Sequence, residues 1–379
     1  MEGPFVFGSH ATQHFFTNRT NEIKTLTNNF IAGTNTMLIS PRRWGKSSLV
    51  MNVSERMKPT HKKIRFCFID LFSVRSEEEF YEVYSQALIN ASESKLEERI
   101  KSVGKFFRSL LPAIKLPVDG QNDLELNFEW KQLKRNADDI INLAERICRE
   151  KKIKLIVCID EFQNISNFSD SLGFQKKLRA QWQKHQLTTY CLYGSKRQMM
   201  AHIFESPAMP FYKFGDVLFL KKIDRKHWIK FIVKQFASKG NSITEEVANE
   251  IAERMEDHPY FVQQLAQEAW QLSEKKCLLK DVDAAVSRLM EKLSILYQRE
   301  IDQLSNKQIN FLKALANGET RFTTLDVLEK YRLGTSGNVI KMKKVLESEE
   351  LIDSMEPEIQ FTDPLFKLWF RKYMMKESD

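Results

Sequence analysis

The segment from Met37 to Ser48 constrains the fold of this chain more than any other. It is an apolar run followed by a loop that ends in Gly45, Lys46 and Ser47, and apolar residues then recur at helical spacing. Strand, loop and helix in this order are the context in which the G-x-x-x-x-G-K-[ST] pattern binds phosphate through backbone N–H groups. The segment therefore predicts an α/β domain that binds a nucleoside triphosphate.

Each position of this loop has an expected task. Lys46 would reach the β and γ phosphate oxygens, the Ser47 hydroxyl would ligate Mg²⁺, and the helix N-terminus would direct N–H groups at the phosphates. Ser40 stands where the pattern has its first glycine, and this departure predicts a restricted first turn. The residues expected to surround the nucleotide phosphates are Pro41, Arg42, Arg43, Trp44, Gly45, Lys46, Ser47 and Ser48.

A second motif is the apolar run 154–159, which ends in Asp160 and Glu161. Such a run predicts a parallel strand buried on both faces, which delivers the two acids to the carboxyl edge of a sheet. Asp160 would hold Mg²⁺ opposite Ser47, and Glu161 would act as the base that polarises the attacking water. The alternative is a core strand that ends in two surface acids. The position of the run after a phosphate loop disfavours this alternative.

The order of elements predicts three domains. Strands alternating with helices through residues 1–222 predict a parallel-sheet α/β domain of the P-loop NTPase class, with an exposed insertion at 111–127. Residues 223–300 are expected to form an all-α lid. Residues 301–379 predict a winged-helix-like domain, with helices at 306–316, 323–331 and 335–347 before a short hairpin.

In a DNA reader, the helix at 335–347 would enter the major groove. Its candidate contacts are Asn338, Lys341, Lys343 and Lys344. The acids of the segment at least match its Lys and Arg residues, whereas a dedicated DNA-binding domain should be clearly basic. We therefore favour packing against a protein or within the chain over DNA contact.

Composition excludes several classes of protein. The chain has 379 residues, a formal net charge of +8 that is dispersed along the sequence, and five cysteines without metal-ligand spacing. The cysteines fit small apolar core residues in a reducing compartment. No apolar stretch approaches membrane-spanning length and the N-terminus lacks a signal peptide, so we expect a cytoplasmic protein with no membrane association.

These motifs resemble the archaeal-type ATPase family, within the AAA+/STAND group of P-loop proteins, over nearly the whole chain. The marks of the resemblance are Phe16-Thr17-Asn18-Arg19 with Glu22, Pro41-Arg42-Arg43 before Gly45-Lys46-Ser47, Ile159-Asp160-Glu161-Phe162-Gln163, Tyr193-Gly194-Ser195, His258-Pro259, and Asp363-Pro364-Leu365-Phe366 with Trp369. The resemblance implies that Asn18 and Arg19 contact the base or ribose, that Ser195 is the polar sensor of the γ-phosphate, and that Pro259 packs on the nucleotide from the lid.

Three functions fit these features. The first is a nucleotide-driven conformational switch that binds ATP and Mg²⁺, hydrolyses ATP slowly and signals to an unknown protein partner. The second is a nucleic-acid-associated ATPase, initiator-like or from a mobile element, that loads on DNA through its winged helix. The third is a nucleotide kinase, which the paired acids and the lack of an arginine-rich acceptor lid disfavour.

Two details refine the first function. A GTPase places Asn-Lys-x-Asp at a strand end to meet guanine, and the comparable run 194–198 has no Asp, so ATP is favoured. No arginine has a secure position as a finger reaching a neighbouring nucleotide, although Arg179, Arg197 and Arg225 are candidates. Without a finger, hydrolysis should be slow and ring assembly is not expected.

Overall fold

The computed structural model describes residues 3–11, 15–92, 114–115, 127–128, 137–354 and 359–375. The chain forms two compact units. One consists of Arg19–Arg42 and Lys46–Lys221, and the other of Met1–Asn18, Arg43–Gly45 and Lys222–Asp379. The two units are described separately below, as the sheet unit and the helical unit.

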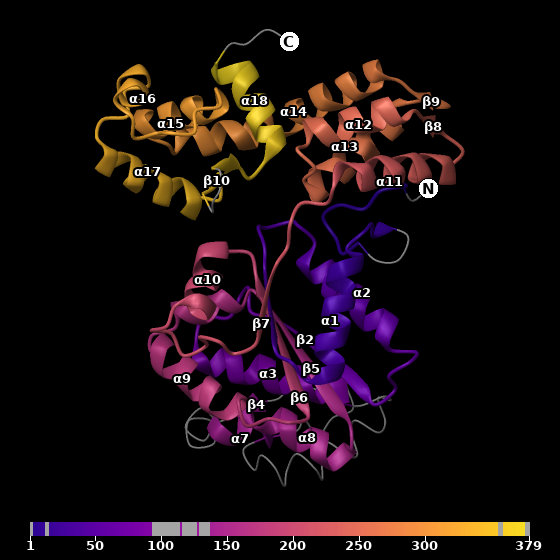
Figure 1. The fold of residues 1–379 in the computed structure, drawn as a ribbon, viewed down its shortest axis with the longest axis vertical. Coiled ribbons are helices and arrows are strands. Elements are labelled where there is room, and N and C mark those ends of the chain that lie inside the picture. The colour runs from indigo at the N-terminus through magenta and orange to yellow at the C-terminus, as the bar shows by residue number, and fades with distance from the viewer. Residues whose placement is uncertain are drawn as a thin grey trace. The chain divides into compact units, whose positions relative to one another are not determined.

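The sheet unit is built on a five-stranded parallel sheet in the order β2-β5-β6-β1-β7 (Figure 1). Numbered along the chain, this is the order 2-3-4-1-5. The predicted α/β class is confirmed. The strands are β1 (Thr36–Ile39), β2 (Ile64–Asp70), β5 (Lys154–Asp160), β6 (Thr188–Gly194) and β7 (Asp216–Phe219).

Helices cover both faces of this sheet, because its central strands are apolar on both sides. Alternate residues such as Leu155 and Val157 pack with helices α3, α7, α8, α9 and α10 in one core. Phe30 and Leu26 of α1 are also fully buried, and α1 and α2 lie together in Figure 1. The helices are α1 (Thr20–Ala32), α2 (Lys46–Met57), α3 (Glu77–Ser92), α7 (Ala137–Ile141), α8 (Leu143–Lys151), η3 (Phe162–Asn167), α9 (Ser171–Trp182) and α10 (Arg197–Glu205).

The insertion expected at 111–127 lies outside the described residues, apart from parts of one short strand pair. This pair is antiparallel and consists of β3 (Ile114–Lys115) and β4 (Asn127–Phe128).

In the helical unit, residues 223–300 form four helices within the described chain: α11 (Arg225–Ser238), α12 (Glu245–Arg254), α13 (Pro259–Leu272) and α14 (Leu279–Asp302). The expectation of an all-α module is wrong in one detail. Two short strands, β8 (Ser242–Ile243) and β9 (Lys276–Cys277), pair in parallel. Each places one residue, Ile243 or Cys277, in the core of this unit.

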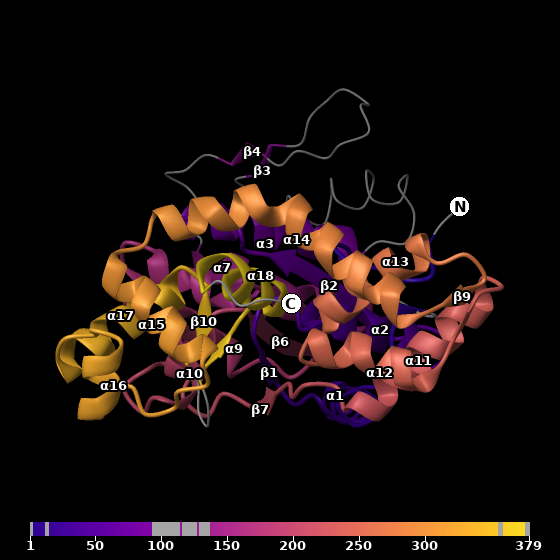
Figure 2. The same ribbon diagram turned by 90° about the horizontal axis from the view of Figure 1, so that it is seen from above.

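The end of the chain has the predicted order of three helices and a hairpin. Its elements are α15 (Asn306–Ala316), α16 (Leu325–Lys330), α17 (Ser336–Ser348), β10 (Ile352–Asp353), β11 (Gln360–Phe361) and α18 (Pro364–Met374). Asp363 caps α18 by accepting from the backbone N–H groups of Leu365 and Phe366, at 2.8 and 2.9 Å. The Tyr297 hydroxyl of α14 donates to the same carboxylate at 3.0 Å, and Figure 2 shows α14 running alongside these elements.

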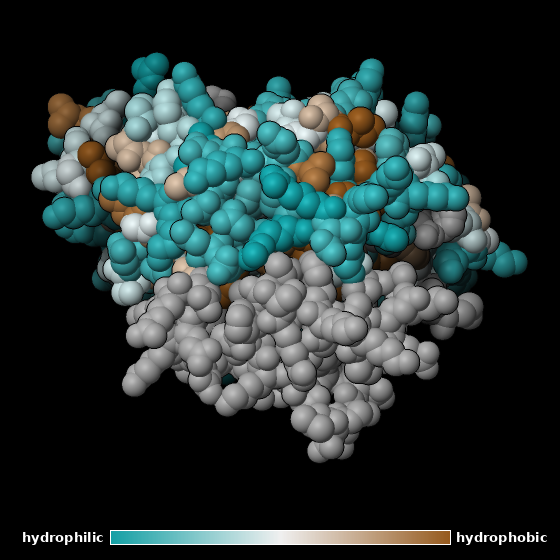
Figure 3. All heavy atoms as spheres, turned by 90° about the horizontal axis from the view of Figure 1, so that it is seen from below, coloured by the Kyte–Doolittle hydropathy of each residue, from teal (hydrophilic) through white to brown (hydrophobic). Residues whose placement is uncertain are grey.

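None of the helices in the described parts of the chain is both long and apolar enough to cross a bilayer. On the face drawn in Figure 3, most of the coloured surface is hydrophilic, and hydrophobic residues occur there only in small groups.

Candidate nucleotide-binding site

The carboxyl ends of β1 and β5 bring together the first two predicted groups. Ser47 lies in the first turn of α2, directly after the phosphate loop, and its hydroxyl donates to Asp160 Oδ2 at 2.5 Å. Asp160 ends β5. Burial raises the pKa of this carboxyl group, while the Ser47 hydrogen bond and the charge of Lys46 oppose that shift. A hydroxyl and a carboxylate are ligands that Mg²⁺ accepts, so the donor pair fits the predicted metal site.

Glu161 follows Asp160 in a left-handed backbone conformation, with a φ of 51°. Its Oε2 atom accepts hydrogen bonds from the Ser195 hydroxyl at 2.8 Å and from Gln163 Nε2 at 2.5 Å. Ser195 follows β6, the strand next to β5. The structure thus brings the expected base and the expected sensor into direct contact.

The phosphate loop has the backbone that its sequence requires. Gly45 has a φ of 87°, a conformation that favours glycine. Ser40 is fully buried and is not among the residues with positive φ. Serine is therefore compatible with this position, and the restriction expected from the missing glycine does not require a strained backbone. The Lys46 ammonium group, itself largely buried, donates to the Pro41 carbonyl at 3.3 Å.

Arg43 and Trp44 group with the helical unit. The Arg43 guanidinium lies 4.8 Å from the centre of the Tyr260 ring, and Trp44 meets the His258 ring edge to face at 6.2 Å. His258 caps α13 by accepting from the Tyr260 backbone N–H at 3.3 Å, and Pro259 occupies the first turn of that helix. α13 thus begins at Pro259, directly after its cap.

The opening segment leads into α1, whose N-cap is Arg19, with a φ of 63° and no side-chain cap. The Arg19 guanidinium is buried and donates to the Lys221 carbonyl at 2.6 Å and to Glu22 at 3.1 Å. These protein contacts fix Arg19 between the start of α1 and the end of the sheet unit. Contact of Asn18 and Arg19 with a base or ribose stays a prediction.

Comparisons with known proteins agree with this architecture. Residues 295–372 match a family described as "Probable winged helix domain". The Walker-type ATPase PABY2304 of Pyrococcus abyssi is 16% identical, with a TM-score of 0.61, over 95% of this chain and 97% of that one. The Aeropyrum pernix ORC2 protein, solved as ADPNP-ADP complexes, is 15% identical, with a TM-score of 0.56, over 95% of each chain.

The chain has the fold of an AAA+ P-loop ATPase followed by a winged helix. The Aeropyrum pernix ORC1 protein, solved in complex with DNA, shares this fold at 10% identity, with a TM-score of 0.50, over 96% of this chain and 94% of that one. No curated protein matches the chain.

Within this AAA+ fold, two of the arginines considered as fingers are engaged by groups of their own unit. Arg225 pairs with Asp257 at 2.5 and 3.0 Å. Arg179 donates to the Pro210 carbonyl at 3.2 Å, and its guanidinium lies 4.8 Å from the centre of the Phe214 ring. Both arginines therefore have structural partners.

The sequence interpretation gave no role to Gln163, which contacts Glu161 directly. The segment Phe162-Gln163-Asn164-Ile165 has two adjacent polar residues, and nothing in the sequence marks Gln163 as the one whose buried amide needs partners. Gln163 is 1% exposed.

His258 gives the chain an expected sensitivity to acid. Burial, and then the charges of Lys222 and Arg43, lower the pKa of His258 to about 3. Below about pH 6.5 the His258 ring is protonated in the unfolded chain but stays neutral in the folded chain. The free energy of unfolding should therefore fall as the pH drops from about 6.5 to about 3. The upper bound of this loss is about 5 kcal/mol.

A His258→Asn variant should flatten this part of the dependence, because asparagine also caps helices but does not titrate. Urea unfolding between pH 4 and pH 7 measures the slope. His185, whose pKa burial lowers to about 4, leaves a residual slope in both proteins. His202→Asn, at an exposed position, is the control, and an unchanged slope in His258→Asn would contradict the assignment.

Proposed function

We propose that this protein binds ATP with Mg²⁺ and hydrolyses it slowly, as a nucleotide-driven conformational switch. The observation that carries the proposal is the convergence of Ser47, Asp160 and Glu161 beside a Gly-Lys-Ser loop. Ser47 and Asp160 lie 2.5 Å apart, and Glu161 follows Asp160 at the same strand end. A P-loop site needs these groups to hold the metal and to accept a proton from water.

Mg²⁺ would be held by Ser47 and Asp160, and when bound it would neutralise charge on the β and γ phosphates. Lys46 would bind the same phosphates and Gly45 would let the backbone approach them. Glu161 would accept the proton of the attacking water, and Ser195 would sense the γ-phosphate beside it. The ADPNP-ADP complexes of the Aeropyrum ORC2 protein support an adenine nucleotide, as does the missing Asp after β6.

Phosphate release from ATP and from GTP, with Mg²⁺ and with EDTA, tests this proposal. We expect turnover with ATP and Mg²⁺ and none in EDTA. Ser47→Ala removes one of the two proposed protein ligands of Mg²⁺. We therefore expect the apparent affinity for Mg²⁺ in ATP binding to fall by about tenfold. Ser54→Ala, a buried serine of the same helix, is the control. Turnover of ATP that is equal in EDTA would reject a metal-dependent ATPase.

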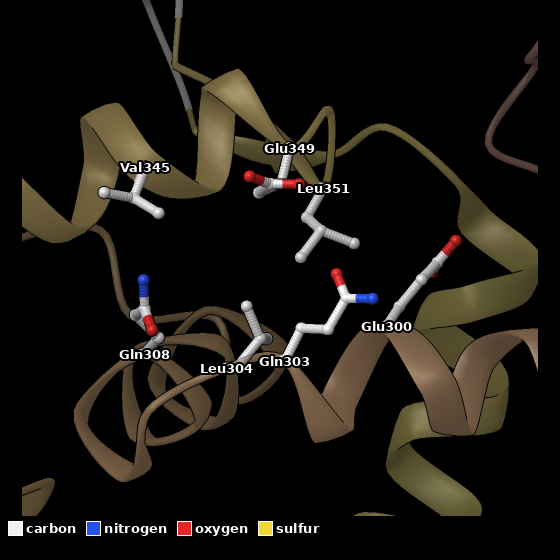
Figure 4. A pocket seen from close by; sticks show the side chains of 7 residues that line it. All are labelled: Glu300, Gln303, Leu304, Gln308, Val345, Glu349 and Leu351. Carbon is white, nitrogen blue, oxygen red and sulfur yellow. The ribbon is translucent and has the colours of Figure 1, made fainter.

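The winged helix is proposed to contact a protein partner. Residues 301–379 contain 12 Lys and Arg against 13 Asp and Glu, so this domain does not contribute to the positive net charge of the chain. A cavity of about 160 Å³ lies beside α17, and two of the residues that line it are glutamates. Figure 4 shows its lining, formed by Glu300, Gln303, Leu304, Gln308, Val345, Glu349 and Leu351.

This lining suits a protein side chain better than a phosphate backbone. The cavity combines apolar side chains with carboxylates and amides, and its volume is below the several hundred Å³ typical of small-molecule pockets. Carboxylates beside α17 would repel DNA phosphates. The cavity therefore supports a partner that presents a basic side chain.

The second candidate function is an ATPase that loads on DNA, favoured by the winged-helix match and by the DNA complex of the Aeropyrum ORC1 protein. Its candidate contacts are those of residues 335–347. Titration with duplex DNA across a salt series separates the two, since phosphate contacts give an affinity that falls steeply with salt. We expect no such response, and a steep slope that Lys341→Ala and Lys344→Ala reduce would favour the DNA function.

A further inference from the structure

Gln163 is held in an unusual way beside the proposed base. It lies in η3 and is 1% exposed, and its Nε2 atom donates to Glu161 Oε2. The Ser195 hydroxyl donates to the same oxygen at 2.8 Å, while the Ser195 backbone N–H is more distant at 3.4 Å. The second carboxylate oxygen, Oε1, receives neither of these side-chain hydrogen bonds.

The orientation of this amide follows from charge. A carboxylate accepts hydrogen bonds, so the NH₂ group of Gln163 must face Glu161, because its carbonyl oxygen in that place would repel the negative charge. The amide Oε1 of Gln163 is then buried, and it has no hydrogen-bond partner in the described part of the chain. A buried acceptor that is left unpaired destabilises the folded state. The arrangement therefore opposes stability at this point.

Gly194 provides the space for this amide. Its φ is not in the left-handed region, so its backbone does not demand glycine. A Cβ atom added there would instead overlap Gln163 Oε1, and it would lie 2.9 Å from Met200 Sδ. The last residue of β6 thus lacks a side chain where the Gln163 amide lies, and Ser195 follows it directly.

We propose that Gln163 is a positioning residue for Glu161. Its amide and the Ser195 hydroxyl hold Oε2, so that Oε1 is left to accept the proton of the attacking water. In that step the water oxygen bonds to the γ-phosphorus, its proton passes to Oε1, and the electron pair of the broken P–O bond stays on ADP. This inference rests on the proposed ATPase activity. It gives a function to the Gln163 amide, whose buried oxygen has no hydrogen-bond partner among the described residues.

Steady-state ATP hydrolysis by Gln163→Leu tests the inference in the full chain. We expect kcat to fall by about tenfold, with KM and the equilibrium affinity for ATP unchanged, because Gln163 acts only through Glu161.

Gln175→Leu is the matched control. Gln175 is fully buried in α9, and its Oε1 also has no hydrogen-bond partner among the described residues. Its Nε2 donates to Ser171 rather than to an acid. A merely structural role for a buried glutamine predicts the same change in both variants, whereas positioning predicts a lower kcat at unchanged KM in Gln163→Leu alone.

Gly194→Ala provides a second test, because its effect on kcat should depend on whether the Gln163 side chain is present. The added methyl group should displace the amide and lower kcat by a similar factor. In a Gln163→Ala background the space is free, so the same substitution should have little further effect, as contacting residues are not additive. Additive losses, or an unchanged kcat in Gln163→Leu, would overturn the inference. Turnover that survives in Glu161→Gln would instead reject the proposed base.

Discussion

Replacement of Glu161 by Gln should leave ATP bound and stop its turnover. The amide is close in size to the carboxylate but cannot take a proton from water, and general-base catalysis typically contributes 10²–10⁴-fold. We therefore expect kcat to fall at least 100-fold while the affinity for ATP stays within about threefold. Single-turnover hydrolysis and equilibrium binding of a fluorescent ATP analogue measure the two quantities.

Glu205→Gln, at an exposed position at the end of α10, is the control for loss of one acidic group. It should retain wild-type kcat. Equal turnover by Glu161→Gln and wild type would remove Glu161 from the role of base. Because it should hold ATP, the Glu161→Gln variant is also the form of the protein in which to search for the partner.

Replacement of Lys46 by Ala should abolish ATP binding. The Lys46 ammonium is largely buried and donates to the Pro41 carbonyl, so it is already ordered where the phosphates are expected. Hydrogen bonds from an ammonium to phosphate are charge-assisted, and losing one from a buried site costs several kcal/mol. We expect the Kd for ATP to rise at least 100-fold in isothermal titration calorimetry.

Lys58→Ala is the matched control, because Lys58 follows the other end of the same helix and is exposed. Its ion pair with Glu55 is a surface contact of little energetic value. An unchanged Kd in Lys46→Ala would reject the nucleotide site as a whole. A thermal unfolding curve of the apo variant checks that the loss of affinity does not come from unfolding.

The sequence predicted the sheet and its motifs because each depends on local pattern. An apolar run between charged segments can be buried on both faces only inside a covered parallel sheet, which fixed β5 and the place of Asp160. The same logic placed Ser47 and Asp160 at one edge, where their side chains do meet. Helix order in the winged helix was predicted correctly for the same reason, since each helix carries its own periodicity.

Other features depend on partners distant in the sequence. The N-cap of α1 is Arg19, whose guanidinium donates to the Lys221 carbonyl, and local capping preferences cannot reveal this contact. The pairing of β8 with β9 joins segments on opposite sides of two helices. The role of Gln163 could not be predicted, because it depends on Glu161 and Gly194 lying beside its amide in the folded chain.

The length of α14 gives the helical unit a mechanical property. This helix has 24 residues, so it extends about 36 Å. Its Arg288 and Lys292 side chains bind Glu268 of α13. Tyr297 and Ser294, within the next two turns, bind Asp363 and Trp369 at the last helix. Because one continuous helix carries both sets of contacts, a rotation of α14 on α13 would be passed to α18 without a hinge.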